Sequence, residues 1–130
     1  MALEAWMSFT NDSNRIKILT CDFSFSQEID ETGKPSSRPQ GGLINITVES
    51  TDKETLAEWM FSKMGMKDGK IEFQLRNNKT KVLSFKEGVC IAYNESFNAA
   101  GSIPMMVHFT ISPNSIKLGS AEFKNEWKKT

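Results

Sequence analysis

Apolar and polar side chains alternate along most of this chain, and that period of two constrains its fold more than any other feature. The alternation is clear in the segments 19–26, 44–49, 71–76, 83–97 and 107–111. Successive side chains of a β-strand point to opposite faces of a sheet, so each segment predicts a strand with one buried face. Turn sequences such as Asn77–Lys79 and Ser112–Ser115 separate them, and Ile116 and Leu118 resume the pattern. The chain therefore predicts about six to eight strands.

Segment 83–97 is unusually long for one strand. Its apolar residues share one parity, and Glu87 and Glu95 interrupt it. A strand of that length usually bends or carries a bulge, where an extra residue is accommodated. Gly88 is the expected position, because glycine inside a strand often marks a bulge.

One segment has the period of a helix instead. Thr51 and Glu54 have the spacing of a capping box, in which each side chain bonds the backbone N–H of the other. Gly65 is a suitable residue to end the helix. We therefore predict a helix over about residues 52–64. Its core or interface face comprises Leu56, Trp59, Met60 and Met64.

The strands do not alternate with helices, so a parallel βαβ sheet is disfavoured. We predict a mainly β fold, an antiparallel barrel or sandwich with one flanking helix, in a single domain spanning residues 1–130. The Gly-, Pro- and Ser-rich stretch Thr32–Gly42 is the one extended break. A domain boundary there would leave too short a piece for an independent core. We expect a long loop at about residues 31–42.

Charge and hydropathy exclude several partners. The chain has 16 Lys plus Arg and 16 Asp plus Glu, which gives a net charge of zero. This balance argues against a nucleic-acid binder or a polybasic membrane surface. The longest apolar run, Val89–Tyr93, is too short to cross a bilayer. The start Met1–Trp6 has no basic region followed by an apolar one, so we expect no secretory signal.

Residues for catalysis or metal binding are sparse. His108 is the one histidine, and it lies on the polar parity of a predicted strand. A catalytic triad needs a histidine held between an acid and a nucleophile, and nothing in the sequence points to either. Cys21 and Cys90 lack the spacing of zinc ligands, although a single bridge between them stays open. We predict no catalytic site, no cofactor and no metal.

The order of several short motifs resembles a known family. They are Phe23–Asp30, Thr32–Ser37, Gly41–Gly42, Ile46–Ser50, Leu56, Glu58–Met60, Lys67–Ile71, Tyr93–Phe97, Gly101, Pro104–Met105, Thr110–Ser112 and Asn125–Trp127. Their order and spacing are similar to the tube protein of Bacteroidetes-type type VI secretion systems, the Hcp (TssD) family. The resemblance covers nearly the whole chain. It departs from the family at the start Met1–Trp6 and at Phe123, where a histidine is expected.

The resemblance implies a compact β-barrel that assembles head to tail into a hexameric ring. Rings would stack into a hollow tube that a contractile sheath expels. The implied partners are further copies of the chain together with the sheath, spike and effector proteins. The implied location is the cytoplasm during assembly, with secretion on firing and without a signal peptide. The ring-stacking candidates are the loop residues Gly33, Lys34, Pro35, Ser36 and Ser37.

Two other classes of function remain as alternatives. The first is a monomeric β-sandwich that acts as a binding or adaptor module and leaves the loop at 33–42 free. The second is a small hydrolase, which the lone His108 disfavours.

Overall fold

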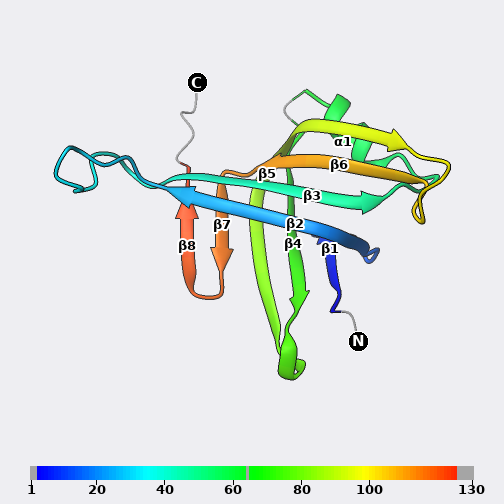
Figure 1. The fold of residues 1–130 in the computed structure, drawn as a ribbon, viewed down its shortest axis with the longest axis horizontal. Coiled ribbons are helices and arrows are strands. Elements are labelled where there is room, and N and C mark those ends of the chain that lie inside the picture. Colours follow the sequence, from blue (N-terminus) through cyan, green and yellow to red (C-terminus); the bar gives the residue numbers. More distant parts are fainter. Residues whose placement is uncertain (1–2, 64, 126–130) are drawn as a thin grey trace.

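The computed structural model describes residues 3–63 and 65–125, which contain eight β-strands, one α-helix and a short 3₁₀ turn (Figure 1). In chain order these are β1 (Ala5–Phe9), β2 (Ile16–Ser26), β3 (Gln40–Glu49), α1 (Thr55–Phe61), β4 (Lys67–Gln74), η1 (Arg76–Asn78), β5 (Thr80–Phe97), β6 (Met105–Ser112), β7 (Ser115–Leu118) and β8 (Ala121–Lys124).

Six of these strands close into a barrel. Their order is β4-β1-β2-β3-β6-β5, and β5 returns to pair with β4. The strands β7 and β8 extend the wall beside the first half of β5. Every pairing is antiparallel. The predicted mainly β fold, an antiparallel barrel with one flanking helix, is confirmed.

The barrel has two walls because β5 belongs to both. Its first half pairs with β4 and β7, and its second half pairs with β6. Figure 1 shows β2, β3 and β6 crossing over β4, β7 and β8. The strand turns from one wall to the other at a bulge, where Glu87 has a φ of 52° and donates its N–H to Asp68. The predicted irregularity near Gly88 is confirmed.

The core lies between the two walls. Its central residues come from β3 and β6, where Ile46 lies opposite Phe109 and Val48 lies opposite Val107. Ile71 of β4 is buried against them from the other wall. Burial of one such side chain contributes about 1.5–3 kcal/mol, so this strictly alternating set dominates the stability of the barrel.

Two residues predicted to face the core are exposed instead. Leu19 and Ile91 are 37% and 48% exposed. The pairing of β2 with β3 shifts register between Ile18 and Thr20, and that of β5 with β6 shifts between Cys90 and Ala92. Each shift inserts one extra residue, which reverses the parity of the side chains that follow.

The terminal strands β1 and β8 were not predicted. In β1, Met7 and Phe9 point into the core. In β8, Phe123 stacks edge-on against Phe25, with 4.9 Å between ring centroids. The phenyl ring at the position where the family pattern suggested histidine therefore packs on the base of the hairpin described below.

The helix is shorter than the predicted span of residues 52–64. It begins after Glu54, and the predicted capping box is absent because the Thr51 hydroxyl accepts the N–H of Lys53 instead. Its last residue is Phe61, and its C-cap is Ser62, whose backbone is extended, and not Gly65. No helix in the two described ranges is both long and apolar enough to cross a membrane.

Candidate functional site

The segment between β2 and β3, residues 27–39, projects far beyond the barrel (Figure 1). It differs from the predicted loop at 31–42, because β3 begins at Gln40 and includes Gly41 and Gly42. Ile29 and Pro35 form an isolated antiparallel bridge. The N–H of Asp30 bonds the carbonyl of Lys34 at 2.9 Å. We call this segment the projecting hairpin.

Asp30 organises the tip of the projecting hairpin. Its Oδ1 accepts the hydroxyl of Thr32 at 2.7 Å, the N–H of Thr32 at 2.9 Å and the N–H of Lys34 at 3.1 Å. These bonds, chiefly that of the Thr32 hydroxyl, lower the pKa of the Asp30 carboxyl below its ordinary value. Gly33 occupies the turn with a φ of 87°. The tip is therefore a defined shape, held by turn chemistry without a core.

The structure places Gly33 and Lys34 at the turn of the projecting hairpin, and Pro35, Ser36 and Ser37 on its returning arm. Gly33 to Ser36 are exposed, and the Ser37 hydroxyl accepts the N–H of Glu28 at 2.8 Å. Ile29 on the other arm is 65% exposed, which is unusual for a large apolar side chain in an ordered segment. The projecting hairpin thus offers both an apolar and a cationic group to a partner.

The predicted helix face divides between core and surface. Trp59 is buried, lies edge-on to Phe9 with centroids 5.3 Å apart, and donates its indole N–H to the carbonyl of Gly65 at 2.8 Å. Leu56 and Met60 are half-buried against the core, and Met64 lies outside the described residues.

Two strand edges lack a partner strand in the described residues. The strand β2 pairs with β1 only through Lys17 and Ile16, so one side of it is open from Ile18 to Ser26. The strand β5 pairs with β4 only as far as Gly88, so its far half is open on that side. Exposed apolar side chains mark both open edges, with Phe97 at 68% exposure on β5. Such edges are ready to pair with another chain.

The outer face of the sheet β2-β3-β6-β5 is polar. Asn45 donates to Asp22 at 3.0 Å and accepts the hydroxyl of Thr110 at 2.8 Å. Thr47 Oγ1 lies 2.7 Å from Nδ1 of His108, which is exposed as its parity indicated. These groups bind one another across three strands, and they line a shallow hollow of about 360 Å³.

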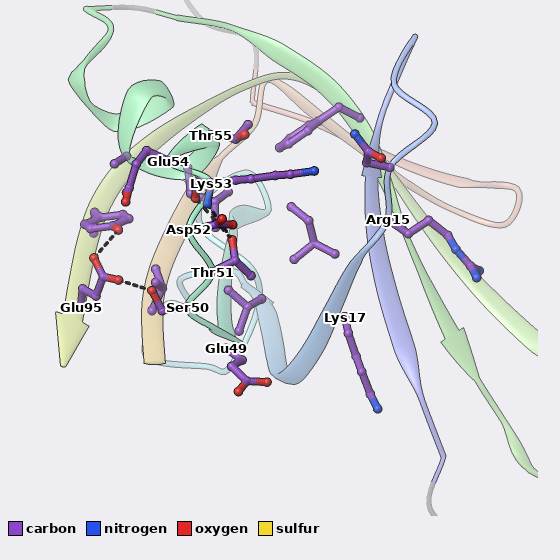
Figure 2. Close-up of a pocket in the computed structure, with 18 of the residues that line it drawn as sticks. Arg15, Lys17, Glu49, Ser50, Thr51, Asp52, Lys53, Glu54, Thr55 and Glu95 are labelled. Carbon is purple, nitrogen blue, oxygen red and sulfur yellow. Dashed lines mark hydrogen bonds between the residues drawn. The ribbon is translucent and has the colours of Figure 1, made fainter. Parts of the chain in front are cut away.

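A groove of about 440 Å³ lies at the end of the barrel away from the projecting hairpin. Figure 2 shows its walls, which come from the β1–β2 turn, the end of β3, the segment before α1 and the far half of β5. We call it the end groove. It was not predicted, because its walls are far apart in the sequence and no single motif marks them.

A hydrogen-bonded acid forms one wall of the end groove. Glu95 accepts the hydroxyls of Tyr93 and Ser50. These bonds, that of Ser50 first, lower the pKa of Glu95. Burial, followed by the neighbouring Glu95, raises the pKa of Tyr93 to about 12. At neutral pH Glu95 is therefore an anion and Tyr93 a neutral donor.

The thiols are separated in the sheet. Cys21 on β2 and Cys90 on β5 are both free, with β3 and β6 between their strands. Burial, together with the nearby Asp22, raises the pKa of Cys21 to about 11. Among residues 3–63 and 65–125, no three His, Cys, Asp or Glu side chains are grouped so as to hold a metal ion.

Comparison with known proteins identifies the family of this chain. The family model described as hemolysin coregulated protein Hcp (TssD) matches residues 1–128. The chain belongs to the Hcp (TssD) family. The predicted family is thereby confirmed, and this Hcp chain is a subunit of a type VI secretion tube.

Solved structures agree over nearly the full length. Hcp1 from Flavobacterium johnsoniae is 35% identical with a TM-score of 0.85, covering 94% of this chain and 99% of that one. Hcp1 from Salmonella typhimurium has the same fold at 12% identity, with a TM-score of 0.72 and coverage of 89% and 85%. A chain of the PVC sheath–tube complex, from an extracellular contractile injection system, shares the fold at 14% identity, with a TM-score of 0.60 and coverage of 90% and 88%. No curated protein matches the chain.

Proposed function

We propose that this Hcp chain forms a hexameric ring in which the open edge of β2 in one subunit meets the open edge of β5 in the next. The observation that supports this is the pair of unpaired edges at opposite sides of one sheet. Two different edges make a heterologous contact, which closes into a ring when its rotation fits. The exposed Leu19 on one edge and the exposed Phe97 on the other would become buried there.

The sheet β2-β3-β6-β5 would then line the channel. The inner face of this sheet packs on the other wall of the barrel. That other wall would lie on the outside of the ring, where the circumference is larger. Six such sheets of four strands give about 24 strands, which at about 4.8 Å each form a circle about 37 Å across. The polar face with Asn45, Thr47 and Thr110 would point into it, which suits a water-filled passage.

Ring stacking follows from the direction of the strands. Because the edges close the ring sideways, the ends of β2 and β3 face the rings above and below. The projecting hairpin lies at one of those ends, so Gly33, Lys34, Pro35, Ser36 and Ser37 are proposed to contact the next ring. Head-to-tail repetition of that contact builds a hollow tube.

The wider partners follow from the family. The tube would be expelled by a contractile sheath, carry a spike at its tip and hold effector proteins in its channel. It would assemble in the cytoplasm and leave on firing without a signal peptide. The role is structural, with no catalysis and no binding of nucleic acid or membrane. The balanced charge of the chain supports close stacking of rings.

The mass of the purified chain in solution tests the ring. We expect light scattering to give a particle of about six times the 14.7 kDa chain mass, and negative-stain images to show annuli. Phe97→Lys should convert it to a monomer, because the charge would be buried at the contact of two edges. Leu75→Lys, at the β4–β5 turn and 40% exposed, is the matched control and should leave the ring intact.

A monomer over a wide concentration range would contradict the proposed ring. It would favour instead the monomeric β-sandwich that binds a ligand or an adaptor. A ring that survives Phe97→Lys would show that the subunits meet elsewhere than at the open edge of β5.

A further inference from the structure

The projecting hairpin and the end groove lie at opposite ends of the same two strands. At one end, Ser26 pairs with Gln40 and the chain continues into the hairpin. At the other, Ile18 pairs with Val48, next to groove residues of both strands. Strand residues rise by about 3.3 Å each, so the two sites are roughly 30 Å apart along the strands. A second copy displaced along the strands therefore brings its hairpin toward this groove.

The two surfaces are chemically complementary. The end groove has an apolar floor, to which Val48, Leu56 and Val107 contribute. The hairpin exposes Ile29, which is 65% exposed and is not among the side chains packed against the core in the described residues. An apolar side chain entering a concave, partly apolar site is the usual anchor of an interface.

Charged side chains also lie on both surfaces. More acidic than basic side chains line the end groove: Asp12, Glu49, Asp52, Glu54 and Glu95 against Arg15, Lys17 and Lys53, most of which Figure 2 labels. The carboxylate of Glu54 makes no hydrogen bond or ion pair in the described residues, and neither does the ammonium group of Lys34 at the hairpin tip. Each unpaired charge is therefore free to pair with its opposite on another copy.

We propose that the end groove is the receptor for the projecting hairpin of a second copy in the adjoining ring, with Ile29 on the apolar floor and Lys34 beside Glu54. This rests on the proposed ring and names the partner surface of its stacking contact. Each subunit uses both surfaces, its hairpin on one side and its groove on the other. The contact repeats without closing on itself, which gives a filament of rings.

Exchanging the charges of Lys34 and Glu54 tests whether these two side chains pair between copies. Lys34→Glu and Glu54→Lys each place like charges together at the contact, and each should lower the yield of tubes by about tenfold or more. The double variant restores opposite charges at every contact and should recover most of the tubes. Tube yield is measured by sedimentation and electron microscopy, and ring mass by light scattering.

Two control variants accompany the exchange. Glu58→Lys changes a residue of α1 outside the groove, and Lys81→Glu changes a residue at the start of β5, in the half that does not line the groove. Both change the net charge by the same amount as the test variants, and both should leave tube yield unchanged.

A cross-link gives an independent measurement. In a Cys21→Ala and Cys90→Ala background, Ser36→Cys on the hairpin and Thr55→Cys at the groove should form disulfides only when rings stack. Since each chain would join one neighbour above and one below, oxidised tubes should give a ladder of linked chains on a denaturing gel. Either cysteine alone should give no ladder.

The outcomes distinguish this proposal from the proposed hexameric ring on which it rests. Normal rings with reduced tubes in both single variants, recovery in the double variant and a disulfide ladder support the hairpin-in-groove contact. Normal tubes in the single variants, or tubes without a ladder, overturn it and leave the ring standing. Absence of a six-subunit particle in the unaltered chain overturns the ring itself.

Discussion

The barrel and the projecting hairpin are held together by different forces. In the barrel, the buried side chains are apolar, and no buried polar or charged residue occurs in the described part of the chain. In the hairpin, residues 27–36 are all exposed, and order comes from the bridge at Ile29 and from the bonds to Asp30. The comparison teaches that the barrel and the projecting hairpin can be changed separately. Mutations of the first should unfold the subunit, and mutations of the second should change only its assembly.

The largest effect is expected in the barrel. Phe109 is 2% exposed and lies between Ile46 and Tyr93 on the neighbouring strands. Phe109→Ala should lower the free energy of unfolding by about 3–5 kcal/mol, because it leaves a cavity between the walls. Urea denaturation followed by fluorescence measures the loss. A change below about 1 kcal/mol would mean that the two walls depend little on this contact.

A second substitution acts where the barrel meets the hairpin. Gly41 has a φ of 120°, and a Cβ there would clash with the carbonyl oxygen of Ser24. Gly41→Ala should therefore cost about 1–3 kcal/mol of stability. Gly101→Ala is the control, since a Cβ there would meet only ordinary contacts at 3.5 Å. Equal unfolding midpoints for the two variants would contradict the backbone argument.

The hairpin should respond in assembly and not in stability. Asp30→Ala removes the acceptor for Thr32 and Lys34 and should loosen the tip. We expect the thermal midpoint and the ring mass to stay unchanged while tube yield falls by about tenfold. Thr32→Val is a graded companion that removes one of the three bonds. A fall in ring mass would show that the hairpin contributes within the ring.

Lowering the pH should produce the smallest of these effects, and it should act on the carboxyl group of Asp30. The pKa of Asp30 is lowered by its hydrogen bonds, so its carboxylate stabilises the tip above the ordinary pKa and loses that role as pH falls through the lowered one. The amide signals of Thr32 and Lys34 should stay constant from neutral pH to about pH 4 and shift only below it. In Asp30→Asn the same signals should show no such transition. A shift near pH 5 would contradict the lowered pKa.

Alternation predicted the barrel wherever strands run in regular register. Val107, Phe109 and Ile111 are buried as their spacing indicated. It was wrong at Leu19 and Ile91, because a bulge depends on the partner strand and leaves no mark in the alternation itself. The helix start was wrong because Thr51 bonds the nearer backbone N–H of Lys53.

The candidate surfaces were harder to predict from the sequence than the core. The projecting hairpin could be located from its Gly, Pro and Ser content, although the role of Asp30 depends on three bonds that only the folded tip reveals. The end groove and the open edges could not be predicted. They form where a strand pairing ends early, and how far a pairing extends depends on both strands and not on either segment alone.

The continuity of β5 through both walls has a mechanical consequence. A tube driven lengthwise transmits thrust from ring to ring, and that load would enter each subunit through the sheet β2-β3-β6-β5. In a sandwich of two separate sheets, such a load would be resisted only by side chains sliding past one another. Here β5 crosses from one wall to the other at Glu87 and Gly88. Shear between the walls must therefore stretch a covalent backbone, which makes the subunit stiff along the axis of travel.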